Sequence, residues 1–135
     1  MSDWRFGYSP EAWGRAKSEI RNLLIQVARG ATPTRTVTYH EVAQSVQAIE
    51  LDPRDPKLNA LLGDLSREEV QAGRGMLSAL VVTADSGRPG EGFFEWAGEL
   101  GLTAEDPEDL WQQQFSLVIA SHTGTDPRSA STSNT

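Results

Sequence analysis

Helix-starting signals recur along this chain, and they constrain its fold more than any other feature of the sequence. Each signal places a capping side chain before a stretch in which apolar residues return every three or four positions, the spacing of one helix face. The signals are Ser9-Pro10, Thr38 to Glu41, Asp55-Pro56 and Asp106-Pro107. Proline suits the first turn because its missing N–H would have no partner there. The sequence therefore predicts a mainly α-helical chain.

Four predicted helices follow from these signals. They run from residue 10 to Gly30, from 39 toward Asp52, from 56 to Gly73, and from 107 to 121. Residues 66–69 have the form of a second capping box, so the third helix either continues through them or restarts there. The expected core residues of the four helices are Trp13, Ala16, Ile20, Leu23, Leu24, Val27, Val42, Val46, Ile49, Leu58, Leu61, Leu62, Leu65, Leu110, Trp111, Phe115, Val118 and Ile119.

Strand signals lie between the third and the last helix. Residues 76–83 form an apolar run with β-branched residues near its end, which is typical of a buried strand. Residues 85–92 are dense in turn formers, and residues 93–100 fit either a return strand or a short helix that ends at Gly101. With an extended residue at Val37, the pattern predicts an α+β, mainly α fold. It would be a winged-helix-like core with a β hairpin and an extra C-terminal helix.

Length and composition indicate one domain. The 135 residues, of which 38% are hydrophobic, suffice for a single packed core. We assign residues 1–121 to this domain and the Ser/Thr-rich residues 122–135 to a flexible, disordered tail. The absence of cysteine removes disulfides, thiolate metal sites and thiol catalysis. No apolar run matches a signal peptide or a membrane span, so we expect a cytoplasmic protein with no membrane partner.

The net charge of -7 is distributed unevenly along the chain. Residues 1–75 carry ten Lys/Arg and ten Asp/Glu, whereas residues 76–135 carry two Arg against nine acids. Nucleic-acid backbones are bound through neutralising Lys and Arg. Any contact with double-stranded DNA would therefore use the N-terminal half of the chain, and the acidic C-terminal half would oppose it.

Three segments together resemble a known DNA-binding domain. Thr36 to Ala43, Pro56 to Gly63, and Val81-Val82 with the glycine-bearing turn that follows are similar to the winged-helix domain of the alkylguanine-DNA alkyltransferases. The resemblance covers residues 35–92 and implies that Tyr39 presses on a backbone phosphate. The recognition-helix arginine of that family is replaced here by Ala60, and its Pro-Cys-His-Arg strand by residues 77–80, Leu-Ser-Ala-Leu. Alkyl transfer is thereby excluded.

The sequence predicts no catalytic, metal-binding or cofactor-binding residues. His40 and His122 are the only imidazoles and have no assigned partner, and Ser78 lacks the sharp turn of a catalytic serine. The acidic residues 105–109 fit the positive end of a helix dipole better than a cation site. Residues 86–92 are a tight turn, a DNA-contacting wing or a protein-contacting loop, and they lack the ending of a phosphate-binding loop.

The prediction for function is a non-enzymatic binding role with two alternatives, and an enzyme of unfamiliar type is a third hypothesis, because the lack of a known motif does not exclude one. The first is a nucleic-acid-associated regulator, and the second is an acidic adaptor that binds another protein. The candidate nucleic-acid-binding residues are Tyr39, Arg54, Lys57, Asn59, Arg67 and Arg88. The candidate partner-binding residues are Phe93, Phe94 and Trp96, although aromatic residues at this spacing more often belong to a core.

Overall fold

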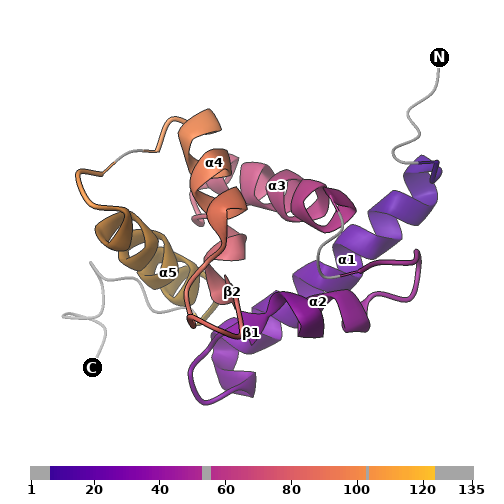
Figure 1. Cartoon of the computed structure of the whole chain (residues 1–135), viewed down its shortest axis with the longest axis horizontal. Helices are drawn as coiled ribbons and strands as arrows, with labels where there is room; N and C mark the ends of the chain where they lie inside the picture. The colour runs from indigo at the N-terminus through magenta and orange to yellow at the C-terminus, as the bar shows by residue number, and fades with distance from the viewer. Residues whose placement is uncertain (1–6, 53–55, 103, 124–135) are drawn as a thin grey trace.

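The computed structural model describes residues 7–52, 56–102 and 104–123, and it is mainly α-helical with a small two-stranded sheet (Figure 1). The order of the elements is α1 (Pro10–Gln26), a π-helical turn (Val27–Ala31), β1 (Val37–Thr38), α2 (Tyr39–Ser45), α3 (Pro56–Gln71), a 3₁₀ turn (Leu77–Leu80), β2 (Val81–Val82), α4 (Glu91–Glu99) and α5 (Pro107–Thr123). No helix in the described ranges is long and apolar enough to cross a membrane.

The predicted cap at Ser9 is confirmed. Its side chain accepts a hydrogen bond from the backbone N–H of Ala12 at 3.2 Å, and Pro10 begins α1. The helix loosens into a π-helical turn at its end, where Gly30 has a φ of +100° and reverses the chain. The expected stop at Gly30 is therefore also confirmed.

The predicted capping box of α2 is confirmed as well. The Thr38 hydroxyl accepts a hydrogen bond from the Glu41 N–H at 3.1 Å, and the Glu41 carboxylate accepts one from the Thr38 N–H at 2.9 Å. We expect Thr38→Ala to lower the free energy of unfolding by about 1 kcal/mol, because the Glu41 N–H loses its acceptor and the reciprocal capping box is broken. Urea unfolding would measure this, with Thr38→Ser as the control that keeps the hydroxyl. An equal loss in the serine variant would contradict the capping explanation.

The second helix ends earlier than the sequence predicts. It stops at Ser45, and Val46 is extended with φ -88° and ψ 126°. The carboxylate of Glu19, on α1, accepts hydrogen bonds from the N–H groups of Gln47 and Ala48, each at 3.0 Å. Because Glu19 satisfies these two N–H groups, they need no partner within α2, and the helix can end here. Val46 nevertheless stays buried.

Of the two alternatives for residues 66–69, the third helix continues through them, because α3 runs without interruption to Gln71. The Ser66 hydroxyl is buried and bonds the Ser78 hydroxyl at 2.8 Å rather than capping a helix. Asp55, the expected cap of α3, lies outside the described residues, while Pro56 is the first helical residue as predicted.

The predicted β hairpin is wrong for the described part of the chain. Residues 77–80 form a 3₁₀ turn, and only Val81 and Val82 are extended. They pair in parallel with Val37 and Thr38, so the two strands come from distant parts of the sequence. Residues 91–99 adopt the helical alternative, α4, and the chain reverses at Gly101, where φ is +77°. A continuous apolar run cannot by its periodicity distinguish a buried strand from a buried turn.

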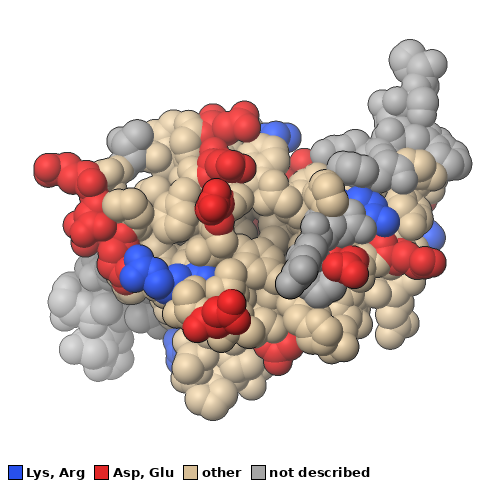
Figure 2. Space-filling view, in the orientation of Figure 1, with Lys and Arg blue, Asp and Glu red and all other residues tan. Residues whose placement is uncertain are grey.

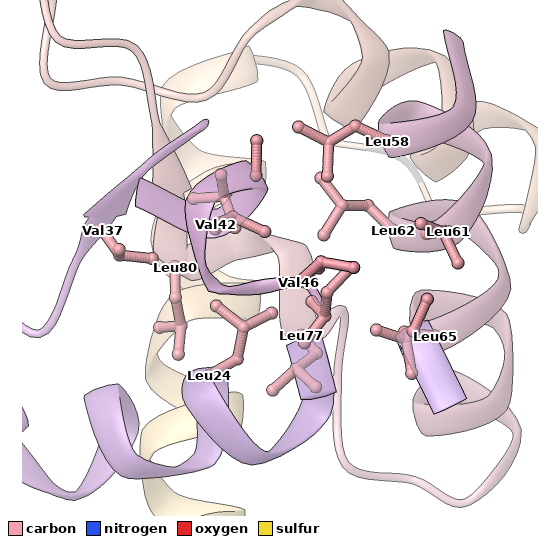
Figure 3. Close-up of a cluster of buried hydrophobic side chains, with 14 of the residues drawn as sticks. Leu24, Val37, Val42, Val46, Leu58, Leu61, Leu62, Leu65, Leu77 and Leu80 are labelled. Atoms are coloured by element: carbon pink, nitrogen blue, oxygen red, sulfur yellow. The ribbon is translucent and has the colours of Figure 1, made fainter. Parts of the chain in front are cut away.

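Two clusters of buried side chains form the core. The larger one lies between α1, α2, α3 and the 3₁₀ turn, and Figure 3 shows its leucines and valines directed toward one another. The smaller one lies between α4, α5 and Met76, and Phe115 packs against both clusters. The C-terminal helix is therefore part of the core, since the Trp111 indole N–H also donates to the Ala79 carbonyl at 2.9 Å.

The last helix extends two residues into the predicted tail, through His122 and Thr123. Its start agrees with the sequence prediction, because the Asp106 carboxylate accepts a hydrogen bond from the Glu108 N–H at 3.0 Å. The remainder of the predicted tail, residues 124–135, lies outside the described residues.

Candidate binding surface

Tyr39 begins α2 and fixes the loop that leads into α4. Its hydroxyl accepts a hydrogen bond from the Gly90 N–H at 2.9 Å. Burial raises the pKa of the Tyr39 phenol above its usual value, more than this hydrogen bond lowers it. Tyr39 thus stays neutral and is already bonded within the chain, which leaves it a positioning role in this structure.

The cationic candidates on α3 have aromatic or acidic neighbours. The Lys57 ammonium lies 5.1 Å from the centre of the Tyr8 ring, and the Arg67 guanidinium lies 5.4 Å from that of Trp96. Arg67 also forms an ion pair with Asp64 at 3.8 Å. Arg54 lies outside the described residues. These cations therefore do not form one continuous basic face on α3.

Asn59 is exposed on α3 and touches the first turn of α4. A Cβ at Gly92 would overlap the Asn59 side chain, so this side chain packs directly against the backbone of Gly92. Because Tyr39 bonds Gly90 and Asn59 abuts Gly92, the turn at residues 90–92 brings these two predicted residues near each other.

Arg88 lies in a compact loop rather than at the tip of a hairpin wing. The Thr83 N–H donates to the Arg88 carbonyl at 2.8 Å, and the Gly87 N–H donates to the Thr83 carbonyl at 2.9 Å. The Arg88 guanidinium forms an ion pair with Glu108 and lies 5.8 Å from the centre of the Trp111 ring. The loop is therefore held against α5 by its only cation.

The three aromatic candidates on α4 differ in accessibility. Phe93 is only 3% exposed and meets Phe94 edge to face, with ring centres 5.0 Å apart. Trp96 packs on Gly63, where an added Cβ would overlap its ring. Phe93 thus belongs to the core, Trp96 joins α4 to α3, and the half-buried Phe94 is left as the candidate for partner contact.

Acidic side chains line the outer side of α4. Glu91, Glu95 and Glu99 are exposed and lie four residues apart, which places them on one helix face. None of them forms an ion pair within the described ranges. Asp106 and Asp109, at the start of α5, are exposed as well. Figure 2 shows acidic side chains over α4 and over the start of α5, and we call these five residues the acidic face.

The structure gives Ser78 a partner in the core and leaves His40 at the surface. Ser78 is 5% exposed and bonds Ser66, while His40 is exposed at the start of α2. No group of three or more His, Asp or Glu side chains with a geometry able to hold a metal ion was found in the part of the chain that the structure describes. The carboxylates at residues 105–109 do not form one.

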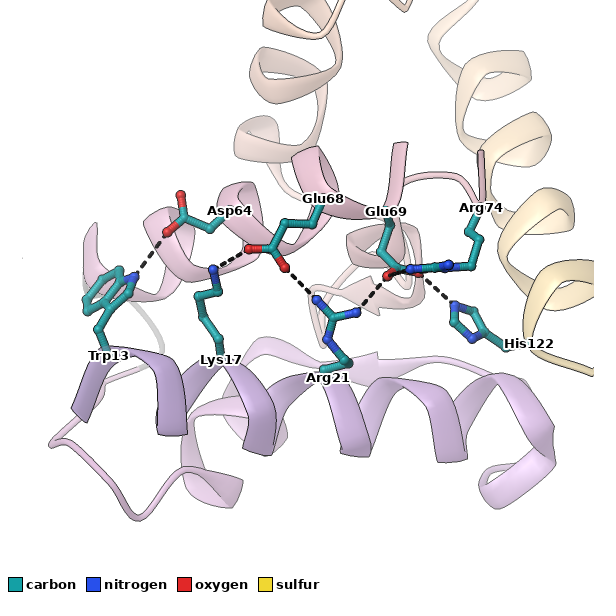
Figure 4. Close-up of polar contacts among 8 residues, drawn as sticks. All are labelled: Trp13, Lys17, Arg21, Asp64, Glu68, Glu69, Arg74 and His122. Atoms are coloured by element: carbon teal, nitrogen blue, oxygen red, sulfur yellow. Dashed lines mark hydrogen bonds and ion pairs between the residues drawn. The ribbon is translucent and has the colours of Figure 1, made fainter. Parts of the chain in front are cut away.

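A buried ionic cluster joins α1, α3 and α5, and sequence reasoning missed it (Figure 4). Glu69 is fully buried, and its carboxylate binds Arg21 at 2.8 Å, Arg74 at 2.9 Å and the His122 ring nitrogen Nε2 at 2.9 Å. The neighbouring Glu68 binds Lys17 and Arg21. The prediction that His122 lacks a partner and opens the tail is therefore wrong. The sequence offers one sign of this cluster: Glu69 lies four residues after Leu65, on the apolar side of α3, where a buried carboxylate needs a partner.

A scan against protein-family models, a search of curated proteins and a search of solved structures found no match to this chain. The geometry of the described residues is therefore the basis for a functional assignment.

Proposed function

We propose that this chain is a non-catalytic binding module, an adaptor whose acidic face contacts a basic segment of a partner protein. The observation that carries the proposal is the row of exposed carboxylates Glu91, Glu95 and Glu99 on α4, none of which forms an ion pair in the described residues. Like charges four residues apart destabilise a helix by about 0.2–0.5 kcal/mol per pair. A basic partner would remove that cost and would be steered toward the face.

An aromatic side chain beside the glutamates also supports a protein-binding surface. Phe94 is half-buried and lies three residues after Glu91, so it borders the glutamate row. Interfaces combine a desolvated aromatic contact with a charged rim, because the apolar contact supplies affinity and the rim supplies orientation and association rate. The acidic face with Phe94 has both components.

A binding assay with a defined basic probe tests the proposal. We expect a fluorescent peptide rich in Lys and Arg to bind the full chain at low salt and to bind more weakly as salt is added. Glu95→Gln/Glu99→Gln should weaken this binding about fivefold, because two charge pairs of up to 1 kcal/mol each are lost. Fluorescence anisotropy would measure the affinities.

Glu11→Gln/Glu50→Gln is the matched control for this assay. These two glutamates are also exposed, so the control removes the same charge from α1 and from the segment after α2. The control should leave affinity within twofold of the wild type. Equal weakening by both double variants, or no binding of the peptide at low salt, would refute the acidic face as the contact site.

Double-stranded DNA is the second candidate partner, and one observation favours it. Tyr39 bonds the backbone of Gly90 and Asn59 contacts Gly92, so two of the candidate nucleic-acid-binding residues border the same turn. If the module binds DNA, affinity for a mixed-sequence duplex should fall steeply with salt, and Lys57→Gln should reduce that slope by about one phosphate. No duplex binding at low salt would reject this candidate.

A further inference from the structure

An open pocket lies between the end of α1 and the end of α5, away from the acidic face. It has a volume of about 720 Å³ and is lined by Arg29, Arg35, Ser121, His122 and Thr123. It is an open depression of the surface rather than an enclosed cavity. Since α5 has 17 residues and rises about 1.5 Å per residue, its two ends are roughly 25 Å apart. This pocket is therefore separate from the proposed protein-binding surface.

The pocket is cationic in a chain whose net charge is -7. Its described lining includes two arginines, two hydroxyl side chains and an imidazole, with no carboxylate. Neither Arg29 nor Arg35 forms an ion pair with a carboxylate in the ranges that the structure describes. The end of α5 contributes only about half a negative charge, which two full positive charges outweigh. The local field therefore favours an anion.

Three contacts hold the walls of the pocket in place. The Arg29 Nε–H donates to the His122 carbonyl at 2.9 Å, which fixes that guanidinium against the last turn of α5. The His122 ring is held by the buried carboxylate of Glu69. The Thr123 hydroxyl donates to the Ile119 carbonyl at 2.6 Å. Through His122, the pocket is thus adjacent to the ionic cluster that joins α1, α3 and α5.

Arg35 occupies an unusual backbone position. Its φ is +58°, in the left-handed region that costs a residue with a Cβ about 1 kcal/mol or more. Its N–H donates to the Thr32 carbonyl at 3.2 Å, and its guanidinium lies beside Gly30. A glycine would adopt this turn without strain. The arginine at this position instead places a guanidinium group there, and this group has no anionic partner among the described residues. Strained positions of this kind concentrate at functional sites.

We propose that this pocket binds the oxyanion of a small ligand, a phosphate or a carboxylate group, between the guanidinium groups of Arg29 and Arg35. Planar guanidinium groups match the geometry of such oxyanions and can donate two parallel hydrogen bonds to them. The hydroxyl of Ser121 is available as a further donor at the rim.

Titration with inorganic pyrophosphate and with succinate tests the proposal and distinguishes the two sources of oxyanion. We expect at least one of them to bind the full chain with a dissociation constant below about 10 mM, the weak end of specific binding. Tighter binding of pyrophosphate assigns the site to phosphorylated compounds, and tighter binding of succinate assigns it to carboxylates. Binding of neither anion would overturn the proposal.

Arg35→Gln locates the site, because it removes one charged donor. Affinity should fall about tenfold or more, as expected for the loss of charge-assisted hydrogen bonds. Arg15→Gln is the control, since Arg15 is exposed on α1 and does not line the pocket. Equal weakening by both variants would show attraction to net charge alone and would overturn the assignment.

A measurement on the wild type keeps the test independent of variant folding. Amide chemical shifts in ¹H–¹⁵N NMR spectra should move at residues 29–35 and 121–123 when the anion is added. Shifts gathered elsewhere would overturn the proposal. The acidic-face variant Glu95→Gln/Glu99→Gln should bind the anion as the wild type does, so failure of one proposal leaves the other testable.

Discussion

Glu69→Gln should lower the free energy of unfolding by about 3 kcal/mol, which corresponds to a fall in melting temperature of roughly 10 °C. The Glu69 carboxylate is fully buried and is shared by Arg21, Arg74 and His122. Glutamine keeps the shape but removes the charge, so the guanidinium groups of Arg21 and Arg74 lose their common counter-ion. Urea and thermal unfolding followed by circular dichroism would measure the loss.

Glu68→Gln is the matched control for this prediction. Glu68 is adjacent in the sequence and also binds Arg21, at 2.5 Å, but its side chain is 41% exposed. Water can replace the lost contacts of an exposed carboxylate, so the expected cost is below about 1 kcal/mol. If both substitutions lowered the free energy of unfolding equally, burial of the carboxylate would not explain its contribution to stability.

The same carboxylate gives the stability a pH dependence of predictable sign. Burial by itself would raise the pKa of Glu69, but hydrogen bonds from Arg74 and His122 and the charges of Arg74 and Arg21 outweigh it and hold the pKa below 4.5. A lowered pKa stabilises the fold above the unfolded-state pKa, and this contribution disappears as the pH falls through the folded-state value. The difference between wild type and Glu69→Gln should therefore shrink as the pH falls below the unfolded-state pKa of about 4.3. A difference that grows toward low pH would contradict this sign.

Gly63→Ala is expected to cost about 2 kcal/mol, because the new methyl group would overlap the Trp96 ring. Gly63 is a buried residue in the middle of α3, where alanine would otherwise favour the helix. The close approach of α3 and α4 requires the missing side chain. Urea unfolding with tryptophan fluorescence would report both the stability and the environment of the ring.

Gly14→Ala is the control for the glycine at position 63. Gly14 lies within α1, and a Cβ there would meet nothing within 4 Å, so alanine should raise stability by about 0.5–1 kcal/mol. Trp96→Leu should relieve the overlap, and the cost of Gly63→Ala in that background should fall by about 1 kcal/mol or more. Additive effects of the two substitutions would contradict a direct clash.

Some features of the fold were predictable because they depend on residues close together in the sequence. The caps at Ser9, Thr38 and Asp106 need only a side chain and the backbone N–H groups two or three positions later. The apolar spacing of α1 and α5 likewise identified their buried sides. Residues 93–100 fit a strand as well as a helix, since a short aromatic run has no clear period.

Other features depended on partners that the sequence does not place. The second helix ends at Ser45 because Glu19 of α1 binds the backbone beyond it. The apolar segment 76–83 forms a turn and a two-residue strand because it fits between α3 and α5 and pairs with β1. The local sequence pattern does not show which distant residues will pack against a segment. The prediction of a β hairpin was therefore wrong.

The sequence by itself determined where most helices begin, which sides they bury, and that the C-terminal half is acidic. Only the tertiary structure decided which charges are used within the chain and which remain available. Arg67 and Arg88, which the sequence predicts as nucleic-acid-binding residues, contact Trp96 and Glu108 within the chain, whereas Arg29 and Arg35 line a pocket that the sequence does not predict. The physical reason is that ionic contacts act over a few ångströms in space, and Glu69 meets Arg21 and His122 across 48 and 53 positions of sequence.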